Sequence, residues 1–102
     1  MGVLKSIVPT VDHKAIGYPV SAIIFIDAKP GYIEKAADLL KQMPNILMVY
    51  EILGKCNFIV KGVFKDENDL SEFIEKLHKS GFITRTKTSI VIKSWEKFHL
   101  SI

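Results

Sequence analysis

The chain has 102 residues and a mass of 11.5 kDa, which is the size of one domain, because halves of this length would bury too little apolar surface to fold alone. Hydrophobic residues make up 48% and charged residues 25%, proportions that exclude an intrinsically disordered chain. The formal charge is +3, but all the cations except Arg85 are Lys, whereas bidentate recognition of bases and phosphates favours Arg, so nucleic-acid binding is weakly supported.

The number of cysteines and the length of the apolar stretches indicate the cellular compartment. A single cysteine, Cys56, forms no internal disulfide and fits a reducing environment. The segment Met1–Pro9 lacks the apolar run of a signal peptide, and the longest apolar stretch, Ala22–Ile26, is far shorter than the roughly 20 residues that span a bilayer. We therefore expect a cytoplasmic protein without membrane contact.

Runs rich in Ile, Val and Phe alternate with two helical stretches. Turn residues such as Lys29-Pro30-Gly31 separate them. The expected strands are Val20–Ala28, Ile46–Leu53, Asn57–Phe64 and Ile83–Lys93, preceded by a short edge segment, Leu4–Val11, that Pro9 interrupts. A tight hairpin at Gly54-Lys55-Cys56 is expected between the second and third strands.

Two helices are predicted from apolar residues at the i, i+3, i+4, i+7 spacing of a buried helix face. The first helix is expected to end at about Met43, before Pro44; the second is expected to begin at the N-cap Asp66 and to end at Gly81. The residues that carry this spacing are Ile33, Ala36, Ala37 and Leu40 in the first helix and Leu70, Phe73, Ile74 and Leu77 in the second.

The order of the elements predicts an α+β fold of the ferredoxin-like βαββαβ type. Two strand–helix–strand units with right-handed crossovers interleave into a four-stranded antiparallel sheet with both helices on one face. The first and third strands are expected to be central, because they are the most apolar.

The face of the sheet opposite the helices is predicted to be apolar as well. Ile23 and Phe25 alternate with inward-facing residues of the first strand, and Ile59 and Val63 do the same in the third. An exposed patch of several hundred Å² corresponds to several kcal/mol in favour of association at about 25 cal/mol per Å². We therefore expect a homodimer that forms through the sheet.

No catalytic constellation is visible, so the chain is not expected to be an enzyme. His13, His78 and His99 lie in separate elements, which indicates no metal site, and no cofactor motif is present. A small enzyme on this fold would need a convergent acid, base or arginine site. An RNA-binding domain has the same topology, but Lys61-Gly62-Val63-Phe64 has Val63 where the RNA-binding signature has an aromatic residue.

Two segments remain as candidates for ligand binding. Free backbone N–H groups in the hairpin Gly54-Lys55-Cys56-Asn57 can hold a carboxylate. Thr84, Thr86 and Thr88 alternate along the last strand and share one face. The alternative is that they have no ligand role, because threonine is a good strand former and is common on a hydrated sheet face.

These segments resemble the C-terminal effector-binding domain, or RAM domain, of the Lrp/AsnC transcription regulators. The resemblance covers about residues 4 to 96. It lies in four motifs of the family. The first two are a Pro-Gly turn, here Pro30-Gly31, and a proline that stops the first helix, here in Met43-Pro44. The other two are a glycine-containing hairpin, Tyr50 to Asn57, and a final strand with Arg-Thr-x-Thr, Gly81 to Thr88.

The resemblance implies a domain organisation and a site. Residues 1–19 would be a connecting strand and linker, 20–96 the effector-binding and oligomerisation domain, and 97–102 a C-terminal tail. In the family, dimers form by facing their sheets and associate into tetramers or octamers, and small effectors, often amino acids, bind between dimers. The implied ligand-binding residues, with the hairpin facing the last strand, are Gly54, Lys55, Cys56, Asn57, Thr86 and Thr88.

The sequence departs from the family pattern in two ways. No helix-turn-helix fits before Val20, so we expect a stand-alone module without direct DNA binding that modulates a full-length Lrp/AsnC regulator by co-assembly. The hairpin aspartate of the family is here Asn57, which supplies no charge for a ligand ammonium group. A purely structural assembly domain without a ligand is the alternative.

Overall fold

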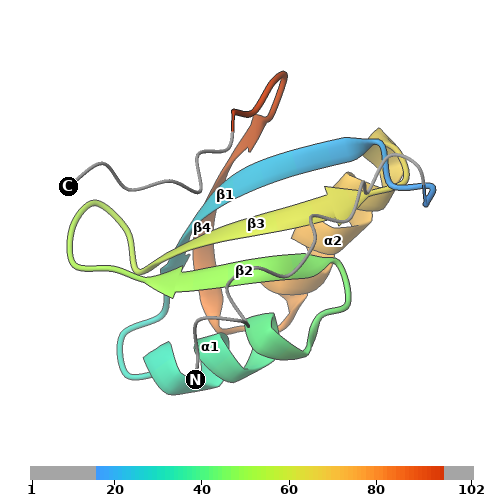
Figure 1. The fold of residues 1–102 in the computed structure, drawn as a ribbon. Helices are drawn as coiled ribbons and strands as arrows, with labels where there is room; N and C mark the ends of the chain where they lie inside the picture. Colours follow the sequence, from blue (N-terminus) through green and yellow to red (C-terminus); the bar gives the residue numbers. More distant parts are fainter. Residues whose placement is uncertain (1–15, 96–102) are drawn as a thin grey trace, which may run out of the picture.

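The computed structural model describes residues 16–95; the predicted segment Leu4–Val11 and the tail at 97–102 lie outside this range. The sheet has the order β2-β3-β1-β4, every neighbouring pair is antiparallel, and both helices pack on the same side (Figure 1). This confirms the predicted ferredoxin-like fold with central first and third strands. In chain order the elements are β1 (Val20–Ala28), α1 (Ile33–Gln42), β2 (Ile46–Glu51), β3 (Phe58–Phe64), α2 (Glu67–Lys79) and β4 (Ile83–Ile90).

The helix ends follow local chemistry. At the start of α2 the Asp66 side chain accepts a hydrogen bond of 2.8 Å from the backbone N–H of Asp69, as an N-cap does. Gly81 follows α2 with a φ of 83°, a backbone conformation that favours glycine. The other helix, α1, ends at Gln42, because Met43 before Pro44 is extended.

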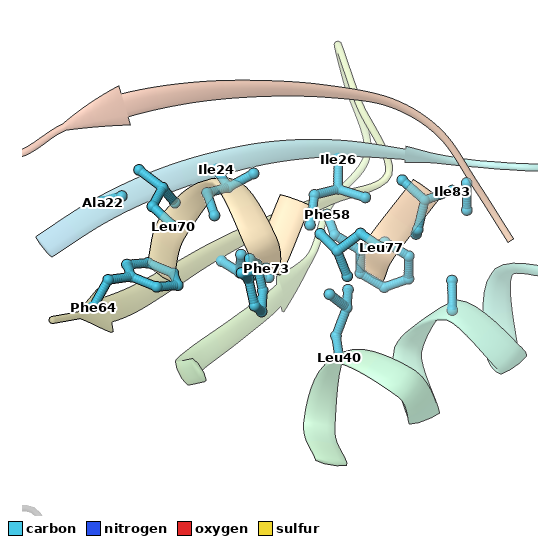
Figure 2. Close-up of a cluster of buried hydrophobic side chains, with 13 residues drawn as sticks. Ala22, Ile24, Ile26, Leu40, Phe58, Phe64, Leu70, Phe73, Leu77 and Ile83 are labelled. Atoms are coloured by element: carbon cyan, nitrogen blue, oxygen red, sulfur yellow. The ribbon is translucent and has the colours of Figure 1, made fainter. Parts of the chain in front are cut away.

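The core lies between the sheet and the two helices. Ala22, Ile24 and Ile26 alternate along β1 and are completely buried, and Leu40 of α1 and Leu77 of α2 are completely buried as well. Figure 2 shows these side chains converging in one cluster with Phe58 and Phe64 of β3. Burial of each large side chain contributes about 1.5–3 kcal/mol, so this layer holds the sheet on the helices.

The connection between β2 and β3 is longer than the tight hairpin that the sequence predicts. Residues 52–57 form it, because β2 ends at Glu51 and β3 begins at Phe58. Asn57 turns towards β1, where its N–H donates to Ile26 O at 3.0 Å. The last strand, β4, ends at Ile90 and not at Lys93, although the backbone N–H of Val91 still donates to Ser21 O of β1 at 2.8 Å.

Within residues 16–95 no helix combines the length and the apolar character needed to cross a membrane.

Candidate ligand-binding site at the β2–β3 hairpin

The sheet face opposite the helices, here called the open face, is formed by alternate residues of the two central strands. Ile23 and Phe25 of β1 and Ile59 of β3 lie on it and are half-buried in the single chain. Val63 lies on the same face but is only 6% exposed in the single chain, so it has little further area to bury. The four residues expected at the dimer interface therefore share a face, and three of them keep apolar area for an interaction.

A cavity of about 370 Å³ lies where the open face meets the β2–β3 hairpin. This volume is within the usual range for small-molecule sites. The lining residues come from β1, from the hairpin and from β4, three places far apart in the chain: Phe25 and Asp27, then Lys55 and Cys56, and then Arg85, Lys87 and Ser89.

The antiparallel register of β1 and β4 sets the order of these groups. Asp27 lies opposite Arg85, and Phe25 lies opposite Lys87. A register shift between Asp27 and Ala28 ends this regular pairing. The cavity thus places a carboxylate and a guanidinium side by side at one end and an aromatic ring beside an ammonium group further along.

The charges that line the cavity form no ion pairs with each other. Among residues 16–95 the ion pairs join Lys41 to Asp38 and Lys79 to Glu75, both on exposed helix surfaces. Asp27, Lys55, Arg85 and Lys87 take part in neither. Charges of both signs are therefore available to a bound molecule.

Two of the hairpin residues form hydrogen bonds within the chain, and the other two are exposed at the tip. The Oδ1 atom of Asn57 accepts a hydrogen bond of 2.8 Å from the backbone N–H of Ala28, and the Cys56 thiol donates to the carbonyl of Phe58 at 3.3 Å. Gly54 and Lys55 are exposed at the hairpin tip, and Lys55 reaches the cavity. Asn57 thus connects the hairpin to β1, and its oxygen has a partner within the chain.

The two threonines expected at the site lie on the other face of the sheet. Thr86 and Thr88 are opposite the buried residues Ile26 and Ile24 and therefore point to the helix side. The Thr86 Oγ1 atom lies 3.0 Å from Nε2 of His78 on α2. Within one chain the hairpin does face the last strand, but alternation on β4 turns Arg85, Lys87 and Ser89 to the cavity and not the two threonines.

Sequence reasoning missed Asp27 and Lys87 and considered Arg85 only as part of a motif. The signal was available, because in a strand whose threonines share one face the residues between them share the other. On β1, Asp27 is a charged residue at the end of an apolar run. In the described part of the chain no three His, Cys, Asp or Glu side chains are placed to hold a metal ion.

Fold and cavity together define a small α+β domain of ferredoxin-like topology with a charged cavity at the edge of its open sheet face. The chain belongs to the Lrp/AsnC ligand binding domain family, whose model matches residues 21–98. The family resemblance inferred from the sequence is thereby confirmed.

Curated relatives of the chain include transcriptional regulators. The HTH-type transcriptional regulator FL11 of Pyrococcus furiosus is 33% identical over 92 residues, which cover 90% of this chain and 61% of the relative. FL11 of Pyrococcus horikoshii is 31% identical over 93 residues, with 91% and 62% covered. The chain therefore spans about three fifths of the length of these relatives.

Solved structures with the same fold include regulators and one shorter chain. LrpC of Bacillus subtilis superposes with a TM-score of 0.81 at 26% identity and covers 93% of this chain and 66% of its own. FFRP-DM1 is 32% identical with a TM-score of 0.68, and the match covers 72% of this chain and 99% of FFRP-DM1. The L-Met complex of a transcriptional regulator from Neisseria meningitidis gives a TM-score of 0.83 at 16% identity, over 94% of this chain and 64% of its own, and shows the shared fold alone.

Proposed function

We propose that this chain is a regulatory module that binds a small effector, an amino acid, assembles through its open face and modulates transcription regulators by co-assembly. The observation that carries the proposal is the cavity, which is lined by charges of both signs and one aromatic ring. A free amino acid presents an ammonium group and a carboxylate on one carbon atom, and Asp27 beside Arg85 offers a complementary pair.

The comparisons support this proposal in two ways. The family is defined by a ligand-binding domain, and one structural neighbour from Neisseria meningitidis was solved with L-Met. FFRP-DM1, which the chain matches over 99% of its length, supports folding of this domain without a DNA-binding part. A partner that carries such a part, a full-length Lrp/AsnC regulator, would connect effector binding to transcription.

The proposed site begins with the hairpin and continues across the cavity. Lys55 and Cys56 line the cavity and Gly54 lies at the hairpin tip, and a ligand-binding role is proposed for all three. A ligand role for Thr86 and Thr88 stays a prediction that needs a second chain, because within one chain both lie on the helix side of the sheet. Asn57 is proposed to shape the site through its bond to Ala28.

A ligand screen with two readouts tests the proposal. The twenty amino acids are added one at a time at millimolar concentration, and thermal unfolding and sedimentation are measured. A ligand present at 100 times its Kd stabilises a protein by about 2.7 kcal/mol, so an effector should raise the Tm by several degrees. The response should be lost in Arg85→Gln and kept in Lys76→Gln, which removes an exposed charge on α2. Failure of every amino acid to stabilise the protein would contradict the proposal.

A purely structural assembly domain is the second candidate. It is favoured by Asn57, which replaces the family aspartate and whose oxygen is already bonded to the backbone. This function predicts a dimer that depends on protein concentration and ignores all twenty amino acids in the same screen.

An RNA-binding domain and a small enzyme, which can both be built on this fold, have less support. An RNA-binding domain stacks bases on aromatic residues of the central strands, and in the described central strands the open face offers Phe25 alone, beside Ile59 and Lys61. Against an enzyme, the named relatives are regulators of transcription.

A further inference from the structure

We infer that the cavity between the hairpin and the open face selects an amino acid with an acidic side chain, aspartate or glutamate, over neutral amino acids. The inference rests on the proposed function and names the ligand class of the same site. It is carried by the charges that line the cavity and by their positions on three elements.

The charge count of the lining is unequal. Lys55, Arg85 and Lys87 are cationic, whereas Asp27 is the one carboxylate among the lining residues. The ammonium group of a bound amino acid would be neutralised by Asp27, and its α-carboxylate would use one cation. Two cations then remain without an anion, and a second carboxylate on the ligand reduces this excess to one positive charge.

The positions of the cations allow one ligand to reach them together. Arg85 lies opposite Asp27, and its planar guanidinium can bind the α-carboxylate in a bidentate manner next to the ammonium site. Lys87 lies two residues after Arg85 on the same face of β4, and Lys55 comes from the hairpin. A side-chain carboxylate therefore finds two ammonium groups beyond the α-carbon.

The charged groups of the cavity distinguish an acidic ligand from a hydrophobic one. Phe25 and Cys56 supply the apolar lining, and the other five lining residues carry charges or a hydroxyl group. One ring can support the one or two methylene groups of aspartate or glutamate. A leucine or methionine side chain would leave Lys55 and Lys87 uncompensated.

The expected preference is moderate, because the charged residues are accessible to water. Exposed ion pairs are individually weak, so two of them give a preference of about tenfold in Kd. Salt screens such pairs, so the preference should shrink between about 0.02 and 0.5 M ionic strength.

Calorimetric titration of the whole 102-residue chain at low ionic strength tests the inference. The ligands are glutamate, glutamine, aspartate, asparagine and methionine, with inorganic phosphate as a simple anion. We expect the acidic member of each pair to bind about ten times more tightly than its amide. Lys87→Gln should reduce that ratio several-fold, and its matched control Lys76→Gln on α2 should leave it unchanged.

The ammonium contact is tested by comparing glutamate with succinate, which has two carboxylates and no amino group. Asp27→Asn should weaken glutamate binding and leave succinate binding unchanged or stronger, because only glutamate loses a partner. An equal effect on both ligands would overturn the role assigned to Asp27.

The outcomes separate this inference from the proposed function. Methionine or glutamine binding as tightly as glutamate would overturn the inference and leave effector binding intact. Phosphate binding as tightly as glutamate would overturn the inference in favour of an unspecific anion site. If no amino acid binds, the proposed amino-acid effector and the ligand class both fall.

Discussion

Asn57, at the base of the hairpin, bonds both to β1 and to the opposite arm of the hairpin. Its side-chain oxygen accepts from Ala28 N–H at 2.8 Å, its backbone N–H donates to Ile26, and its carbonyl accepts from Ile52 N–H. Removing the side-chain acceptor leaves a partly buried N–H without a partner. We expect Asn57→Ala to lower the free energy of unfolding by about 1–3 kcal/mol, measured by urea denaturation.

Two further variants separate this bond from general effects. Asn57→Asp keeps an acceptor at the same place and should stay close to the wild-type stability. Asn68→Ala removes an exposed amide at the start of α2 and should change stability by less than about 0.5 kcal/mol. Equal losses in Asn57→Ala and Asn57→Asp would show that the bond to Ala28 is not what the asparagine provides.

At the scale of the element, α2 has a side-chain cap and α1 has none. Asp66 caps α2 by accepting from Asp69 N–H, and the Asp69 carboxylate accepts from Lys65 N–H at 2.9 Å. Asp66→Ala should cost about 1 kcal/mol in thermal or urea unfolding. Asp38→Ala, which removes an exposed carboxylate and its ion pair with Lys41 in α1, serves as the comparison and should cost much less. The cap is unimportant if the two variants lose the same stability.

The bounds of the strands show where sequence patterns are enough to predict them. The first strand has the bounds that the sequence predicts, Val20–Ala28, because an apolar run between Pro19 and the Pro30-Gly31 turn has no competing structure. For the second strand the sequence predicts an end at Leu53, two residues beyond the observed end of β2. Beyond Glu51 the backbone N–H of Ile52 still donates to the Asn57 carbonyl, while the Asn57 side chain bonds to β1, which is distant in the chain.

For the whole molecule, the open face is the surface on which association is expected. Ile59→Lys would place a charge among half-buried apolar residues, and an interface between identical faces loses that contact twice. At about 1.5–3 kcal/mol per side chain, the dimer should weaken by at least about a hundredfold, as measured by sedimentation velocity over a range of protein concentrations. Ser71→Lys adds the same charge on the exposed surface of α2 and should leave the association unchanged. An Ile59→Lys protein that still forms the wild-type dimer would rule out the open face.

The sequence by itself determined the two-layer fold, since the periodicity of apolar residues and the turn residues act locally and agree with one another along the chain. The family was also readable, because its motifs are continuous segments. The tertiary structure decided which residues form the cavity. Asp27, Lys55 and Arg85 are distant in sequence, and only the antiparallel register and the turn of the hairpin towards β1 bring them together. The same register placed Thr86 and Thr88 on the opposite face of the sheet.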